Sequence, residues 1–89
     1  MSKAQDERQV LRDLGYRIAE LRSALPQTQA EFAETAGFSV KYLQRIEGGR
    51  ANLTVRSLVS LSGHLHVTVA DLFAKPARKG GKRGRPRKE

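Results

Sequence analysis

Apolar residues recur every three or four positions along most of this chain, in short runs separated by glycine, proline or hydroxyl residues. The first run is the longest and contains Val10, Leu11, Leu14, Ile18, Leu21 and Leu25. Such spacing places these residues on one face of a helix, which is expected to end before Pro26. Gly15 lies within this run, and a glycine in a helix interior costs about 1 kcal/mol relative to alanine. The regular helix is therefore expected to begin near Asp13, after a looser N-terminal extension.

Two short helices are expected next, joined at a glycine. The first begins with Thr28 and carries Glu31 three positions later, which is the pattern of a capping box. Gly37 ends this helix. Ser39 can cap the second helix, which ends at a pair of consecutive glycines. Two short helices at this spacing are typical of a helix-turn-helix.

A fourth helix and a short fifth helix complete the pattern. Thr54 and Thr68 can cap them, and leucines at three- and four-residue spacing give the fourth helix an apolar side. The fifth helix is expected over residues 69–73. Three aromatic residues are expected in the core: Phe32, Phe38 and Phe73. The longest strand-like pattern is "HLHVTV", which fits better as the end of one helix and the cap of the next. The chain is therefore expected to be all-α, with five helices.

Length and composition limit the other possibilities. The chain has 89 residues, which is room for one small domain and an appendage. It contains no cysteine, so neither disulfides nor cysteine zinc sites can supplement the core. No apolar run approaches the length of about 18 residues that a membrane span needs. The N-terminus also lacks a signal-peptide pattern. A cytoplasmic protein is therefore expected.

Positive charge is concentrated at the C-terminus. The formal net charge is +8, from 17 Lys and Arg against nine Asp and Glu. Eight of these basic residues and one acid fall in residues 75–89, so the first 74 residues are nearly neutral. This distribution is typical of proteins that bind a polyanion, most often nucleic acid. Three parts are expected: an extension over residues 1–12 that can belong to the first helix, a helical domain over residues 13–74, and a disordered basic tail over residues 75–89.

The run "TQAEFAETAGFSVKYLQRIEGGRANLTVRSLVSLSGHLHVTVADLF" resembles the Cro/C1-type (Xre family) helix-turn-helix domain of phage repressors and bacterial regulators. Separated elements agree, namely "TQAEFA", the turn glycine, "RIEGGR" and "VTVADLF", within about residues 13 to 73. The resemblance implies a five-helix, lambda-repressor-like fold whose third helix lies in the major groove of double-stranded DNA. It implies a bacterial or phage transcriptional regulator, here expected to be a nucleoid-associated repressor that binds an inverted repeat as a homodimer. No cofactor or small-molecule ligand is implied.

The resemblance also implies roles for single residues. Base edges are expected to be read by Val40, Lys41, Gln44 and Arg45. Phosphates are expected to be bound by Gln29, Ser39, Tyr42, Arg50, Asn52 and Arg56. The alternative for Tyr42 is packing against its own bundle. A structural ion pair is expected between Arg22 and Glu47.

The basic tail contains the order Arg83-Gly84-Arg85-Pro86, with Lys82 before it and Arg87 and Lys88 after it. This order resembles the AT-hook, which binds the minor groove of A·T-rich DNA. Glycine lets the backbone lie close to the groove floor, and proline turns the chain without adding a donor. The arginines suit a groove that is narrow and strongly negative. The alternative is a solvated tail that adds only charge.

Other functions find less support in the sequence. No nucleophile lies beside a plausible base, and no glycine-rich loop joins a strand to a helix, so no enzyme is expected. His64 and His66 lack Cys, Asp or Glu at metal-ligand spacing, so no metal site is expected. Two alternatives stay open. One is an architectural, nucleoid-associated protein that coats A·T-rich DNA, and the other is an antitoxin or antiactivator that uses the same fold to bind a protein.

Overall fold

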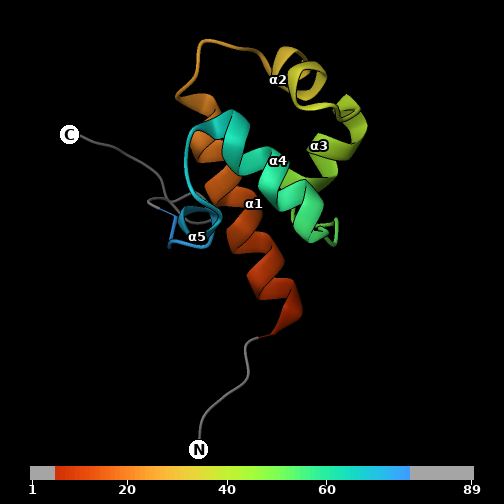
Figure 1. The fold of residues 1–89 in the computed structure, drawn as a ribbon. Helices are drawn as coiled ribbons and strands as arrows, with labels where there is room; N and C mark the ends of the chain where they lie inside the picture. Colours follow the sequence, from red (N-terminus) through yellow and green to blue (C-terminus); the bar gives the residue numbers. More distant parts are fainter. Residues whose placement is uncertain (1–5, 77–89) are drawn as a thin grey trace, which may run out of the picture.

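The computed structural model describes residues 6–76, which form five helices. These are α1 (Glu7–Ser23), α2 (Gln29–Ala36), α3 (Val40–Glu47), α4 (Val55–Leu65) and α5 (Val69–Leu72). No strand occurs within this range, so the expected all-α fold with five helices is confirmed. The long helix α1 packs against α3 and α5, while α4 packs against α2 and α5 (Figure 1).

Side-chain caps fix the starts of the shorter helices. At α2 the Thr28 hydroxyl accepts from the Glu31 N–H at 3.1 Å, and the Glu31 carboxylate accepts from the Thr28 N–H at 2.8 Å. Ser39, Thr54 and Thr68 each accept a backbone N–H in the first turn of α3, α4 and α5. Each of these caps was expected from the sequence and is confirmed.

The helix α1 begins earlier than its sequence predicts. Asp6 caps it and Glu7 is its first residue, so the expected start near Asp13 is wrong. The glycine that suggested a late start is buried against another helix. A Cβ at Gly15 would lie 2.6 Å from the carbonyl oxygen of Ile46 and 2.7 Å from that of Glu47. Tertiary packing of α1 on α3 therefore offsets the low helix propensity of this glycine.

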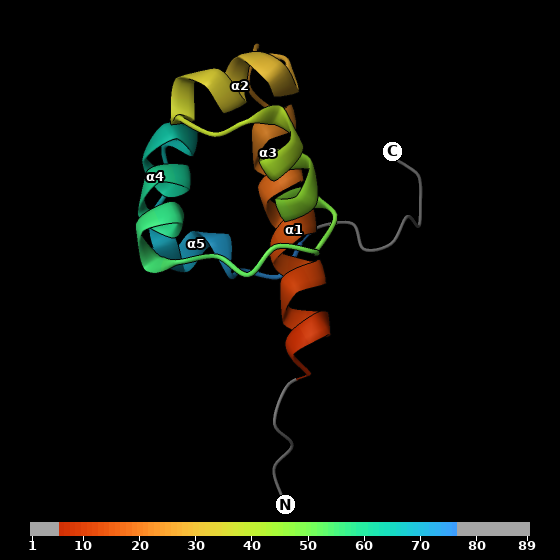
Figure 2. The ribbon, with the colours of Figure 1, turned by 90° about the vertical axis from the view of Figure 1, so that its right-hand side faces the viewer.

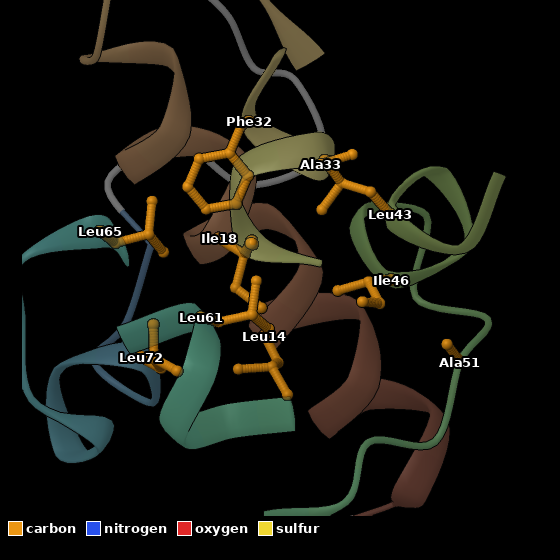
Figure 3. Packing of buried hydrophobic residues seen from close by; sticks show 11 residues of the cluster. Leu14, Ile18, Phe32, Ala33, Leu43, Ile46, Ala51, Leu61, Leu65 and Leu72 are labelled. Atoms are coloured by element: carbon orange, nitrogen blue, oxygen red, sulfur yellow. The ribbon is translucent and has the colours of Figure 1, made fainter. Parts of the chain in front are cut away.

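The core receives side chains from every helix. The largest fully buried side chains are Ile18 of α1, Phe32 of α2, Leu43 of α3, Leu61 of α4 and Leu72 of α5. Figure 3 shows these residues pointing into the space between the helices, and the smaller Ala33 and Ala51 belong to the same buried cluster. Because the five helices share one cluster, no short helix needs to be stable by itself.

The last helix is tied back to the first. The Arg17 Nε donates to the backbone oxygen of Asp71 at 2.9 Å. Hydrogen bonds from Thr68 hold the pKa of the Asp71 carboxyl below its usual range. Pro76 is buried, so the packed part of the chain reaches beyond residue 74. The expected core position of Phe73 is wrong, because its side chain is 51% exposed at the end of α5.

None of the helices in the described part of the chain is long and apolar enough to cross a membrane.

Replacing Gly15 with alanine tests the close approach of α1 and α3. Although alanine favours a helix, its Cβ would collide with two backbone oxygens, so we expect G15A to lower the free energy of unfolding by about 1–3 kcal/mol. Gly63 in α4 is the matched control, because a Cβ there meets nothing within 4 Å. G63A should raise stability by about 0.5–1 kcal/mol. Urea unfolding of both variants measures the difference, and equal effects would contradict the packing argument.

Candidate nucleic-acid interface

The second helix of the pair, α3, presents one polar side. Its residues Leu43 and Ile46 are buried in the core, which leaves the opposite side exposed. That exposed side carries Val40, Lys41, Gln44 and Arg45. Figure 2 views the molecule with α3 in front of α1, where no other helix covers it. A short helix that packs on the core by its apolar side and exposes its polar side can enter a groove such as the major groove of DNA.

The four residues on the exposed side of α3 fall into two pairs. Residues four apart on a helix lie on the same side, so Val40 pairs with Gln44 and Lys41 pairs with Arg45. The Gln44 Nε2 donates to the Gln29 Oε1 in α2 at 3.4 Å. The Arg45 Nη2 donates to the backbone oxygen of Arg50 at 3.2 Å. Gln44 of the first pair therefore contacts α2, and Arg45 of the second pair contacts the loop that follows α3.

An ion pair anchors the C-terminal end of α3 to α1. The Arg22 Nε lies 2.6 Å from the Glu47 Oε2, and the Arg22 Nη2 donates to the Glu47 Oε1 at 3.1 Å. The side chains of Arg22 and Glu47 are 16% and 9% exposed. The pair that the family resemblance implies is thus present in a two-pronged geometry. Such bidentate pairing matters here because a largely buried carboxylate needs its charge and its acceptor sites satisfied.

Glu47 has a further partner that its position in the sequence does not reveal. The Gln29 Nε2 donates to the Glu47 Oε1 at 3.0 Å. Gln29 is the first residue of α2 and is half-buried. These residues are 18 positions apart, and no local pattern predicts their contact. The first turn of α2, the end of α3 and α1 therefore meet at one carboxylate.

Three of the phosphate candidates, Arg50, Asn52 and Arg56, follow α3 in the chain. Arg50 lies just past α3, and its N–H donates to the Arg45 carbonyl at 2.8 Å. Asn52 follows in the α3–α4 loop, and Arg56 lies in the first turn of α4. Within residues 6–76, no hydrogen bond joins Asn52 or Arg56 to the exposed side of α3. Both side chains are exposed.

Ser39 and Tyr42 occupy the first turn of α3. The Ser39 Oγ accepts from the Tyr42 N–H at 3.0 Å, which leaves its own hydroxyl proton available to another acceptor. The Tyr42 ring packs edge-on against Phe38 with centroids 5.4 Å apart. The ring of Tyr42 thus packs on its own bundle, and contact of its hydroxyl with DNA stays a prediction.

The tail residues expected to bind a minor groove lie outside the described residues. They are Lys82, Arg83, Gly84, Arg85, Pro86, Arg87 and Lys88. Within the described part of the chain, no cluster of three or more His, Cys, Asp or Glu side chains could hold a metal ion.

Comparisons with solved structures find the same fold in bacterial regulators. The restriction-modification controller protein C.AhdI from Aeromonas hydrophila shares 28% sequence identity over 78% of this chain and 100% of its own, with a TM-score of 0.72. The clp gene regulator ClgR from C. glutamicum shares 27% identity over 82% of this chain and 90% of its own, with a TM-score of 0.68. A hypothetical transcription factor, NHTF from Neisseria, is 22% identical over 85% of this chain and 87% of its own, with a TM-score of 0.71. At that identity the last likeness concerns the fold alone.

No curated protein matches the chain. A family model described as a helix-turn-helix domain matches residues 13–73, which is more than half of the chain. The match contains α2, α3, α4 and α5 and most of α1. This family and the regulators above are not enzymes, in agreement with the sequence. The chain belongs to the helix-turn-helix domain family.

Proposed function

We propose that this protein is a sequence-specific DNA-binding transcriptional regulator that inserts α3 into the major groove. The observation that carries the proposal is the polar side of α3, which is exposed, free of acidic residues and backed by buried Leu43 and Ile46. An acidic residue there would repel the DNA phosphates, whereas two basic side chains attract them. The likeness to a controller protein and a gene regulator supports the same function.

Base reading is assigned to the exposed side of α3. Lys41 and Arg45 can donate to the O6 and N7 of guanine, Gln44 can pair with adenine, and Val40 can contact a thymine methyl group. Arg45 donates to the Arg50 carbonyl through one guanidinium nitrogen, and its other N–H groups have no partner in the described part of the chain. The arginine can therefore contact a base without leaving the loop.

Backbone phosphates would fix the register of α3. Gln29 and Ser39 lie at the N-terminal ends of α2 and α3, where the helix dipole favours an anion. The other proposed phosphate contacts are Tyr42, Arg50, Asn52 and Arg56. Such contacts position the protein on the duplex and carry no base preference of their own. We assign repression because a bound protein needs no further partner to block a promoter. A regulator of this kind acts in the cytoplasm, where bacterial DNA lies.

A homodimer would double the DNA contact. Val55, Val59 and Phe73 are large apolar side chains that are 74%, 55% and 51% exposed. Phe73 also borders an apolar groove that Leu11 and Leu58 help to line. The groove beside Phe73 supports a twofold interface there, with half-sites about one helical turn apart on the DNA.

The basic tail is proposed to bind the minor groove of A·T-rich flanks through Arg83-Gly84-Arg85-Pro86. A tail tethered to a major-groove reader binds at high effective concentration, so even a weak groove contact adds affinity.

Replacing Lys41 or Arg45 with alanine should relax base preference on duplexes selected from a random pool. We expect a loss of about 1–3 kcal/mol in discrimination at the contacted position. Arg8 in the first turn of α1 is the control of equal charge, and R8A should leave the selected sequence unchanged. If scrambled A·T-rich duplexes compete as well as the selected one against the native chain, the regulator proposal is wrong and an architectural role is favoured.

Replacing Phe73 with aspartate tests the dimer. The exposed side chain contributes little to the core, so F73D should stay folded and sediment as a monomer at concentrations where the native chain is dimeric. F73L keeps the apolar surface and should stay dimeric. Analytical ultracentrifugation measures both. A native chain that is monomeric, alone and on an inverted-repeat duplex, contradicts the proposed dimer.

Two tail variants separate charge from groove binding. R83A/R85A should reduce the salt slope of DNA binding by about 2 per subunit, because two fewer charges release counterions. G84A/P86A keeps every charge, so it should leave the slope unchanged and weaken binding to sites with A·T-rich flanks more than to sites with G·C-rich flanks. Titrations with both duplexes measure these effects. Equal binding of G84A/P86A and the native chain to both duplexes means that the tail adds only charge.

A further inference from the structure

Gln29 is the proposed phosphate contact at the start of α2, and its side chain is already held at both ends. Its Nε2 donates to the Glu47 Oε1 at 3.0 Å. Its Oε1 accepts from the Gln44 Nε2 at 3.4 Å. A glutamine amide has two N–H donors, and the second donor of Gln29 has no partner within residues 6–76. One donor is therefore left for a group outside the protein.

The carboxylate of Glu47 determines which way the Gln29 amide faces. Ionised Glu47 can only accept, so the nitrogen of Gln29 must face it and the oxygen must face away. The reversed amide would set two oxygens against each other. Glu47 is itself fixed by two donors from Arg22, and its side chain is 9% exposed. The orientation of Gln29 thus follows from an ion pair in the interior.

Gln44 completes this arrangement from the other side. The Gln29 oxygen faces α3, where the Gln44 amide is the donor that meets it. Gln44 therefore differs from Arg45, which donates to the loop after α3, and from Lys41, for which no side-chain hydrogen bond occurs within residues 6–76. Val40 lies four residues before Gln44 on the same side of α3, but its side chain has no group that can hydrogen-bond to the Gln29 amide. Hydrogen bonds in a chain of this kind strengthen one another, because each polarises the next.

We propose that Gln44 is a positioning residue for Gln29 and does not read a base. Together with Glu47, it holds the Gln29 amide so that the free N–H meets a DNA phosphate without prior rearrangement. The base-reading set then narrows to Val40, Lys41 and Arg45. This inference rests on the proposed DNA-binding function and revises one of its residue assignments.

A double-mutant cycle tests the positioning role. Q44M keeps the shape and helix propensity of the side chain but removes its donor, and Q29A removes the group that is positioned. Q44M, Q29A and the double variant of the full chain are titrated with the duplex that the native chain enriches from a random pool. We expect Q44M to weaken binding by about 2- to 10-fold, as the loss of one hydrogen bond does. The double variant should bind no more weakly than Q29A, because Gln44 acts through Gln29.

Two further readouts separate positioning from a merely structural role. Gln44 is exposed, so Q44M should leave the thermal midpoint unchanged. Repeating the enrichment with Q44M should return the native sequence preference at every position. K41M is the matched control, because it places the same new side chain on the proposed base-reading residue Lys41. K41M should shift the preferred base, and its loss of binding free energy should add in full to that of Q29A.

Two results would overturn the proposal. One is a changed base preference of Q44M at a single position, and the other is full additivity of Q44M and Q29A. Failure of the proposed function is recognised separately, from the native chain alone. If the native chain binds duplex DNA but enriches no sequence, base reading fails, and the same cycle on random duplex still decides the role of Gln44. If the native chain binds no duplex, both proposals fail together.

Discussion

The close approach of α1 to the end of α3 is the contact on which the rest of the structure depends. Gly15 offers no side chain there, so the backbone of α1 lies against the carbonyl oxygens of Ile46 and Glu47. A helix of eight residues such as α3 is too short to be stable alone, so its direction is set by what it packs against. The exposed polar side of α3 is thus held in place by a residue without a side chain.

The buried ion pair links this packing to the candidate site. Moving a carboxylate out of water costs several kcal/mol in effective terms, which a well-formed partner can offset. Arg22 offsets that cost by donating two hydrogen bonds to Glu47, and Gln29 donates a third. One charged group therefore fixes the end of α3 to α1 and orients the start of α2. Glu47 both stabilises the packing of α3 on α1 and orients Gln29, because the start of α2 and the end of α3 meet at this residue.

Local signals predicted much of the fold, and the exceptions have a common cause. The caps Thr28, Ser39, Thr54 and Thr68 were predictable because a hydroxyl bonds the backbone only three residues away. The start of α1 was not, since helix propensity penalises Gly15 and the compensating contact comes from residues 31 and 32 positions away. Phe73 follows the same rule in reverse, because an apolar side chain at the end of a four-residue helix is buried only if another element covers it.

The sequence by itself determined the five helices and the residues on the exposed side of α3, because both follow from the spacing of nearby residues. It also determined the concentration of charge in the tail, because that is a matter of composition. Family resemblance added the Arg22 and Glu47 pair. Only the tertiary structure showed that Gln29, Gln44 and Glu47 form one hydrogen-bonded chain. The three side chains come from two helices, and their contact depends on the angle at which α2 and α3 pack on each other. That angle is set by the whole core, and no short stretch of sequence contains it.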